Sequence, residues 1–221
     1  MSEVVVDRFS RSRLLFGEDF ARLQSAKILI CGCGGVGGAA IEALYRSGAV
    51  SLSVIDCDRF EITNQNRQLG SEHVGELKCE VFARKFKGVT PIVARIGEEF
   101  LSEFDLAKFD FVIDAIDDVG AKIALALRCS EAGVGFVSSM GGAKRLDPAK
   151  IEIRSIWRTQ GDPLARKIRY ELRKHGFAGD FDVVCSSEPP RVKSMGSFMG
   201  VTASFGLFIA SYVVRKLIGE R

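Results

Sequence analysis

The stretch K-I-L-I-C-G-C-G-G-V-G-G, residues 27–38, decides the fold of this chain. Its first five residues form a short apolar run that predicts a buried strand, and a glycine cluster follows at once. In the next segment (39–48), Ile41 and Leu44 are spaced for one face of a helix that ends in a glycine. The segment L-S-V-I-D (52–56) predicts a second buried strand. Strand, glycine turn, helix and strand together form the βαβ unit of a parallel sheet.

Apolar runs and amphipathic segments continue to alternate along the rest of the chain. Further strands are predicted at 91–96, 109–117, 135–139 and 151–156, and helices at 76–87, 119–132 and 162–176. The polar segment 57–76 has little periodicity and predicts a loop that carries a short helix. Because no internal repeat or low-complexity linker interrupts this order, we expect a single domain over residues 1–221. The fold class is α/β, a Rossmann-like, doubly wound, mostly parallel sheet with helices on both faces.

The composition of the 221 residues is that of a globular protein, with 47% hydrophobic and 27% charged residues. The formal net charge of +3 permits a polyanionic partner such as RNA without demanding one. The six cysteines form no C-x-x-C pair, so we expect neither a four-cysteine zinc site nor a disulfide framework. The N-terminus lacks the apolar core of a signal peptide, and we therefore expect a cytoplasmic protein with reduced thiols.

One uncharged stretch near the C-terminus, residues 194–214, is long enough to span a bilayer. Lys193 and Arg215 flank it. Six small or hydroxylic residues dilute its hydrophobicity: Gly196, Gly200, Thr202, Ser204, Gly206 and Ser211. We expect a buried or partly buried helix of the domain, with membrane association as the less favoured alternative.

The glycine cluster fits a nucleotide-binding loop. Gly32, Gly34 and Gly37 match G-x-G-x-x-G, and Gly35 is an additional glycine. Such a loop lets backbone N–H groups approach phosphate, and the following helix N-terminus favours negative charge. Asp56 ends the next predicted strand, where a carboxylate can hold ribose hydroxyls. Taken alone, these residues fit NAD as well as ATP.

A polar cluster downstream favours ATP. Asn64, Arg67, Gln68 and Lys78 stand in the pattern T-N-Q-N-R-Q followed by V-G-E-L-K. A dehydrogenase has no evident use for two cations just after its ribose-binding carboxylate. An enzyme that directs attack on the α-phosphate of ATP needs them, because charge builds on that phosphate and on the leaving pyrophosphate. The alternative is a charged loop that is simply solvated.

The segment V-I-D-A-I-D-D places three carboxylates at the end of a predicted parallel strand, where open α/β sheets bind ligands. We favour Asp117 as a ligand of the Mg²⁺ that bridges ATP phosphates. Asp118 is expected to cap the following helix, and Asp114 to serve structure.

Together these motifs resemble the adenylation domain shared by ubiquitin-activating enzymes and their bacterial relatives of the ThiF, MoeB and HesA type. The resemblance rests on R-x-x-R near the N-terminus, G-x-G-G-x-G, the strand-ending aspartate, N-x-x-R-Q, the later lysine and D-x-x-D, over roughly residues 8–140. In the second half, Gly141 to Pro148, 160–169 and 183–188 resemble the branch that dehydrates threonylcarbamoyladenosine in tRNA, as does R-L-L-F-G (13–17). The paired C-x-x-C zinc ligands usual in sulfur-carrier enzymes are absent.

The resemblance implies a reaction and its participants. ATP would adenylate the carboxylate of the threonylcarbamoyl group, and an internal nucleophile would then displace AMP, closing a ring with net loss of water. It implies a nucleotide-binding core over 8–140, with 141–221 as a substrate-side segment plus C-terminal helix. It also implies a homodimer in which an arginine finger, either Arg11 or Arg13, reaches the partner's ATP.

The same resemblance implies roles for the residues of the motifs. Residues 32–37 would wrap the nucleotide, and Asp56 would hold its ribose. Phosphate contacts would come from Asn64, Arg67 and Lys78. Asp117 would bind Mg²⁺ and support adenylation.

Three other functions compete with this one. The first is activation of a sulfur-carrier protein, with a sulfur-transfer partner. The second is an NAD-dependent oxidoreductase, and the third is an RNA-binding scaffold. For Cys185, a thioester, a sulfur-relay and a structural role stay open. The cations of 166–174 predict either a solvated helix face or a surface for RNA phosphates, and Trp157 either packs in the core or stacks on a base.

Overall fold

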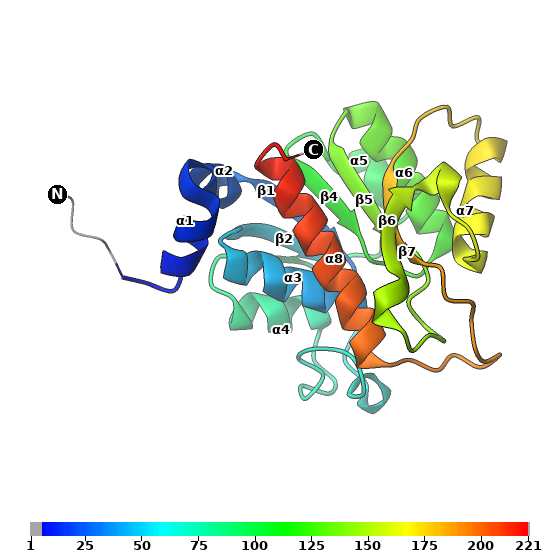
Figure 1. Ribbon diagram of the computed structural model, residues 1–221, viewed down its shortest axis with the longest axis horizontal. Coiled ribbons are helices and arrows are strands. Elements are labelled where there is room, and N and C mark those ends of the chain that lie inside the picture. The colour runs from blue at the N-terminus through cyan, green and yellow to red at the C-terminus, as the bar shows by residue number, and fades with distance from the viewer. Residues whose placement is uncertain (1–5, 221) are drawn as a thin grey trace.

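The computed structural model describes residues 6–220 and builds them around one seven-stranded sheet (Figure 1). The ends of the predicted domain, residues 1–5 and 221, lie outside the described residues. The strand order is β3-β2-β1-β4-β5-β7-β6, with every pair parallel except the antiparallel pair β6 and β7. The strands are β1 Lys27–Cys31, β2 Ser51–Ile55, β3 Thr90–Ile92, β4 Phe111–Asp114, β5 Gly135–Ser139, β6 Ile151–Ser155 and β7 Asp182–Ser186. The predicted mostly parallel, doubly wound α/β sheet is confirmed.

Helices cover both faces of this sheet (Figure 1). They are α1 Ser10–Phe16, α2 Phe20–Ser25, α3 Gly35–Ser47, α4 Lys78–Lys85, α5 Glu98–Glu103, α6 Val119–Ala132, α7 Pro163–Lys174 and α8 Met199–Leu217. In β1, Ile28 and Ile30 pack into the core formed with α3, α4 and α8, whereas Leu29 and Cys31 pack against α5 and α6. All four side chains are buried, because a parallel strand covered on both faces has no solvent side.

The uncharged C-terminal stretch forms α8, which lies along α3 (Figure 1). The approach is close at Gly206, where a Cβ atom would lie 2.3 Å from the carbonyl oxygen of Val36. The helix begins at Met199 and not at 194, and it runs to Leu217. Among residues 6–220, no helix combines the length and hydrophobicity needed to cross a membrane. Nine of its nineteen residues are buried, which confirms the preferred prediction of a buried or partly buried helix.

Several predicted element boundaries are wrong. The strand predicted at 109–117 ends at Asp114, and the strand predicted at 91–96 stops at Ile92. The loops that follow the two strand ends line the cavity described below, through Ala94 and Ile96 after β3 and Ala115 and Ile116 after β4. Strand β7 was not predicted, because its apolar run of three residues, V-V-C, is too short for a strand pattern.

The order of the strands reverses at β1, since β2 lies on one side of it and β4 on the other. Loops that leave the carboxyl ends of β1 and β4 turn to opposite faces of the sheet, which opens a crevice between them. The glycine loop follows β1, and the segment 115–118 follows β4. The topology therefore brings the two principal sequence motifs together.

Candidate active site

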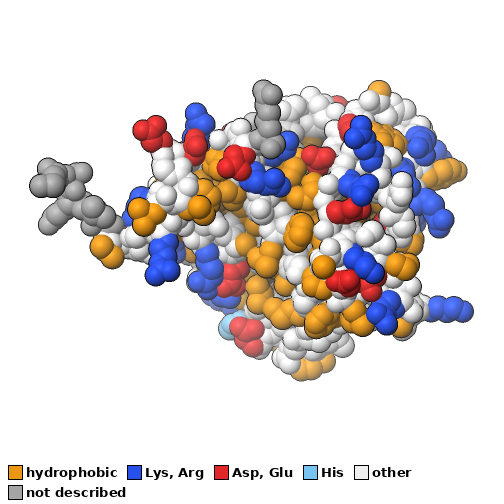
Figure 2. Space-filling model, in the orientation of Figure 1, with side chains coloured by type: hydrophobic (Ala, Val, Ile, Leu, Met, Phe, Trp, Pro, Cys, Tyr) orange, Lys and Arg blue, Asp and Glu red, His pale blue; other side chains and the backbone are white. Residues whose placement is uncertain are grey.

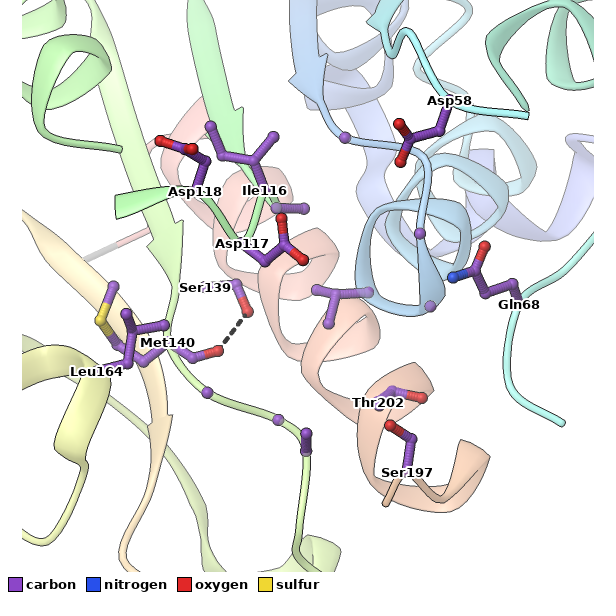
Figure 3. Close-up of a pocket in the computed structure, with 18 of the residues that line it drawn as sticks. Asp58, Gln68, Ile116, Asp117, Asp118, Ser139, Met140, Leu164, Ser197 and Thr202 are labelled. Atoms are coloured by element: carbon purple, nitrogen blue, oxygen red, sulfur yellow. Dashed lines mark hydrogen bonds between the residues drawn. The ribbon is translucent and has the colours of Figure 1, made fainter. Parts of the chain in front are cut away.

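A cavity of about 610 Å³ occupies this crevice, within the range of small-molecule sites. Figure 3 shows its walls, which come from both halves of the chain. One wall is formed by the glycine loop and the segments after β2 and β4, and the other by the segments after β5 and before α7 and α8.

The glycine loop needs its glycines for two different reasons. Gly32 has a φ of +96°, and a Cβ there would lie 2.7 Å from the carbonyl oxygen of Ala115. At Gly37 a Cβ would lie only 1.8 Å from the carbonyl oxygen of Gly32, so this glycine permits the tight turn. Gly37 is not among the residues that line the cavity. Gly34 and Gly35 line the cavity at the start of α3, where free N–H groups and the helix dipole favour phosphate.

Asp56 follows β2 directly and joins the loop to the cavity. Its Oδ2 accepts from the backbone N–H of Cys33 at 2.6 Å, and its Oδ1 accepts from that of Asp58 at 2.7 Å. Burial raises the pKa of Asp56, and these two N–H groups act against that rise. Each carboxylate oxygen has further acceptor capacity, which suits ribose hydroxyls.

The two predicted cations both line the cavity. Arg67 Nη1 donates to the carbonyl oxygen of Thr63 at 3.0 Å and to Asn66 Oδ1 at 2.8 Å. The Lys78 side chain is only 8% exposed, and its Nζ lies 3.1 Å from Oδ2 of Asp58, which is 66% exposed. Lys78 is therefore a desolvated cation whose one carboxylate partner faces solvent, and a phosphate oxygen is a suitable replacement for that partner.

Asn64 and Gln68 lie on the same turn but serve differently. Asn64 is buried and outside the cavity lining, and its Oδ1 accepts from the backbone N–H of Glu61 at 3.1 Å. Its carbonyl oxygen accepts from the backbone N–H groups of Arg67 and Gln68, so it shapes the turn that carries Arg67. Gln68 lines the cavity, and its buried Oε1 has no hydrogen-bond partner among the described residues. A ligand N–H or O–H would satisfy that oxygen.

The three aspartates at the end of β4 and directly after it have separate roles. Asp114 is fully buried, and its Oδ2 pairs with Lys122 Nζ at 2.9 Å. Asp118 caps α6 by accepting from the backbone N–H of Ala121 at 2.9 Å, as predicted. Asp117 is exposed and lines the cavity, and Figure 3 shows its carboxylate pointing away from that of Asp118.

Asp117 fits a magnesium ion shared with nucleotide phosphates. Within residues 6–220, no group of three or more His, Cys, Asp and Glu side chains could cage a metal ion. Mg²⁺ is usually held by one or two carboxylates together with substrate phosphates and water, so a single carboxylate beside a bound phosphate would be sufficient.

The opposite wall contains residues that the motifs did not assign to the site. They are Ser139–Arg145, Asp162–Leu164, Pro190, Met195, Ser197 and Thr202. Buried Arg145 holds this wall, since its Nη2 donates to Asp162 Oδ2 at 3.0 Å and its Nε to the carbonyl oxygen of Glu188 at 2.8 Å. Glu188 Oε2 accepts from the backbone N–H groups of Asp147 and Leu146, which lower the pKa of Glu188.

The predicted arginine fingers lie elsewhere. Arg11 and Arg13 stand on α1, outside the lining of this chain's own cavity. Arg11 is exposed. Arg13 pairs with Asp7 and lies 5.5 Å above the ring of Phe20. A role for either arginine at the nucleotide therefore requires a second copy of the chain.

Cys185 is a poor candidate for a nucleophile. It is fully buried in β7, and burial raises the pKa of its thiol to about 12. A reactive cysteine needs exposure and a lowered pKa. Cys31 and Cys33 are also buried, whereas Cys57 is exposed and lines the cavity.

A family model described as the ThiF family matches residues 9–220. The tRNA threonylcarbamoyladenosine dehydratase of Haemophilus influenzae is 33% identical, over 95% of this chain and 92% of that protein. The enzyme of the same name from Bacillus subtilis is 35% identical, over 85% of this chain and 78% of its own length. A probable molybdopterin-synthase adenylyltransferase of Gracilaria tenuistipitata var. liui is 30% identical, but over only 49% of this chain and 32% of its own.

Solved structures of a dehydratase of the same kind are also similar to this chain over nearly its whole length. The crystal structure of the E. coli tRNA N6-threonylcarbamoyladenosine dehydratase in complex with AMP has a TM-score of 0.92 and 31% identity. The match covers 96% of this chain and 94% of that one. The complex of the same enzyme with ATP has a TM-score of 0.91 and 32% identity over the same shares of the two chains.

Proposed function

We propose that this chain, which belongs to the ThiF family, is an ATP-dependent enzyme that dehydrates threonylcarbamoyladenosine in tRNA. The observation that carries this proposal is the extent of the match to such dehydratases, which includes both walls of the cavity. The likeness to a molybdopterin-synthase adenylyltransferase covers only half of the chain, which disfavours activation of a sulfur-carrier protein.

The reaction has two steps that share one cavity. A carboxylate oxygen of the threonylcarbamoyl group attacks the α-phosphorus of ATP, and pyrophosphate leaves. An internal nucleophile of the same side chain then attacks the activated acyl carbon, the ring closes and AMP leaves with the carboxylate oxygen. The net result is loss of one water from the nucleoside at the expense of ATP.

The chain's own residues provide binding and electrostatic stabilisation for the first step. Arg67 and Lys78 stabilise the charge that builds on the α-phosphate and on the leaving pyrophosphate. Gly34 and Gly35 present the N-terminus of α3 to phosphate, and Asp56 accepts from the ribose hydroxyls. Mg²⁺, held by Asp117 and the phosphates, would supply further charge neutralisation there. Asn64 acts through the turn it shapes, by positioning Arg67.

We also propose that the enzyme works as a homodimer. Helix α1 projects from the body of the molecule (Figure 1) and exposes Leu14 and Leu15. Figure 2 shows a broad area of hydrophobic side chains in the middle of the same view, where α8 exposes Leu207 and Phe208. A second copy of the chain would cover these surfaces, and its α1 would bring Arg11 or Arg13 to the neighbouring cavity.

Three further assignments follow from the same proposal. Residues 1–221 form one adenylating domain, with the nucleotide side in 8–140 and the substrate side in 141–221. An enzyme that acts on tRNA works where tRNA is found, so we place it in the cytoplasm. Ring closure uses no sulfur, so we assign no role to a sulfur-transfer partner.

The decisive experiment is incubation of the purified protein with ATP, Mg²⁺ and tRNA that carries threonylcarbamoyladenosine, followed by mass analysis of the nucleosides. We expect the nucleoside to lose the mass of one water while AMP and pyrophosphate appear. Unchanged tRNA under conditions in which the protein binds ATP would rule out this function. Pyrophosphate exchange driven by the C-terminus of a carrier protein would then support the sulfur-carrier alternative.

A further inference from the structure

Helix α7, Pro163–Lys174, begins at the cavity and leads away from it. Asp162 caps the helix by accepting from the backbone N–H of Ala165 at 3.0 Å. Asp162, Pro163 and Leu164 all line the cavity. A helix rises 1.5 Å per residue, so the last turn of α7 lies about 15 Å along the surface from the cavity edge.

This helix has an excess of positive charge that the fold does not neutralise. Five cations stand on it: Arg166, Lys167, Arg169, Arg173 and Lys174. Its one acidic residue is Glu171, which lies 3.3 Å from Lys174. Arg166 and Lys167 are exposed and make no ion pair within residues 6–220. Figure 2 shows Lys and Arg side chains along the right-hand side, where Figure 1 places α7.

An exposed aromatic ring lies among these cations. Tyr170 is 59% exposed, and Lys174 Nζ lies 5.3 Å from the centre of its ring. Residues three and four apart share a helix face, so Arg166, Lys167 and Arg173 also neighbour the ring. The opposite side of α7 packs into the core through Ala165, Ile168 and Leu172, all buried. Tyr170 therefore contributes nothing to that core and presents its ring to solvent.

Trp157 also lies beside α7, but its ring is packed against other side chains, unlike that of Tyr170. Its Nε1 donates to the carbonyl oxygen of Gly179 at 2.8 Å, its ring packs against Phe177, and Arg173 lies 5.2 Å above it. The ring is half-buried and covered. Trp157 therefore belongs to the packing of α7, and Tyr170 is the open aromatic of this surface.

We propose that the outward side of α7, formed by Arg166, Lys167, Tyr170, Arg173 and Lys174 and called the α7 face, binds the single-stranded RNA that flanks the reacting nucleotide. The proposal rests on the proposed function. A nucleoside that reacts inside a cavity must leave its base stack, so each neighbouring base loses a stacking partner at the cavity edge, where α7 begins. The cations hold the backbone phosphates, and Tyr170 stacks on an unpaired base. An acidic protein segment would use the cations but not the open ring.

The cations are tested by removing two of them and comparing a matched pair. Arg173→Gln with Lys174→Gln removes the cations of the last turn of α7, and Arg215→Gln with Lys216→Gln removes the same dipeptide from the last turn of α8. Binding of unmodified tRNA is measured over a range of salt concentrations. The α7 variant should bind more weakly, with a slope of log Kd against log salt that is smaller by about 1.4. The α8 variant should match the wild type.

A second pair and the ring complete the test. Arg166→Gln with Lys167→Gln should reduce the salt slope by a similar amount, and neither residue makes an ion pair that the change would break. Tyr170→Ala should weaken binding of tRNA by about tenfold or more, whereas Tyr170→Phe keeps the ring and should bind like the wild type. In dehydration assays these losses should appear as a raised KM for tRNA, with ATP binding unchanged.

The outcomes separate this proposal from the proposed function. If the wild type dehydrates tRNA while both α7 pairs and Tyr170→Ala bind tRNA as tightly as the α8 variant, the α7 face does not bind RNA and the function stands. Loss of affinity in Tyr170→Ala without any change in salt slope for the two cation pairs would also overturn the phosphate contacts. If the wild type binds tRNA through the α7 face but leaves threonylcarbamoyladenosine intact, the proposed function fails and the RNA surface remains.

Discussion

The two walls of the cavity use their polar side chains in opposite ways. One wall, formed by the glycine loop and the segments after β2 and β4, is the one that we propose binds the nucleotide, and we call it the nucleotide wall. There Lys78, Gln68 and Asp117 line the cavity, and their links to the protein are few or easily exchanged. On the opposite wall, formed by the segments after β5 and before α7 and α8 and called the substrate wall, Arg145 and Asp162 are buried and bonded to each other. Arg145 also donates to the backbone carbonyl of Glu188, and Asp162 accepts from the backbone N–H of Ala165. The first wall is therefore built for contact with ligand, and the second for holding a shape.

This difference predicts that mutations on the two walls will fail differently. Removal of a side chain that faces the cavity should reduce catalysis and leave the fold intact. Removal of one partner of a buried pair should reduce stability, because the other partner keeps an uncompensated charge. Each of the following experiments tests one side of this contrast.

The largest effect is expected at Lys78. Lys78→Ala removes a desolvated cation that we propose faces the reacting phosphates, and Asp58, its former partner, is mostly in water. We expect kcat for ATP-dependent dehydration to fall by about 10²–10³-fold, as when one transition-state donor is removed, with a nearly unchanged Tm. Lys85→Ala is the matched control, since Lys85 ends the same helix and pairs with Glu42. Equal rates for the two variants would remove Lys78 from the catalytic machinery.

The substrate wall should show the reverse behaviour. Arg145→Ala leaves the fully buried Asp162 without its cation. We expect the free energy of unfolding to fall by about 3–5 kcal/mol, measured by denaturant titration. Arg128→Ala removes an arginine from an exposed pair with Glu131, and its effect should stay below about 1 kcal/mol. The contrast between the walls would collapse if Arg145→Ala were as stable as Arg128→Ala.

The nucleotide wall was predictable from sequence because its residues follow strand ends in short motifs. Gly34, Gly35, Asp56, Arg67 and Asp117 all reach the cavity from loops at the carboxyl edge of a parallel sheet, where topology alone brings them together. The pattern of alternating strands and helices was equally local. That is why the sequence predicts six of the seven strands, all but β7, and most of the helices.

The roles of the other site residues depend on contacts that residue type alone does not reveal. Asn64 was expected at a phosphate, but its side chain bonds its own turn, a competition that short polar side chains often win. Asp58 had no assigned role until the structure placed it beside Lys78. Thr202 reaches the cavity because α8 packs along α3, and Met195 reaches it from the segment before α8, both far from the motifs in sequence. Arg145 and Glu188 are 43 residues apart, and no spacing rule joins them.

Two glycines of one loop allow a finer test of the nucleotide wall. A Cβ at Gly37 would lie 1.8 Å from the carbonyl oxygen of Gly32, so Gly37→Ala should lower the free energy of unfolding by about 1–3 kcal/mol. A Cβ at Gly34 would meet nothing closer than Gln68 Nε2 at 3.8 Å. Gly34→Ala should therefore keep its stability. Because Gly34 lines the cavity, the added methyl group should occupy space that the nucleotide needs and lower the affinity for ATP, measured by calorimetry. A destabilised Gly34→Ala with normal ATP affinity would show that both glycines serve packing alone.

The smallest effect concerns a thiol that reports on the nucleotide wall without taking part in the reaction. Cys57 is exposed in the cavity, whereas the other five cysteines are buried. Iodoacetamide should label the native protein once, and slowly, because burial and the neighbouring Asp58 raise the pKa of the Cys57 thiol. With ATP at about ten times its dissociation constant, labelling should slow about tenfold, since only about a tenth of the sites stay open. Cys57→Ser should abolish the native label. Labelling that ATP does not slow would place the nucleotide away from Asp56 and Lys78, and the two walls would then have to exchange their roles.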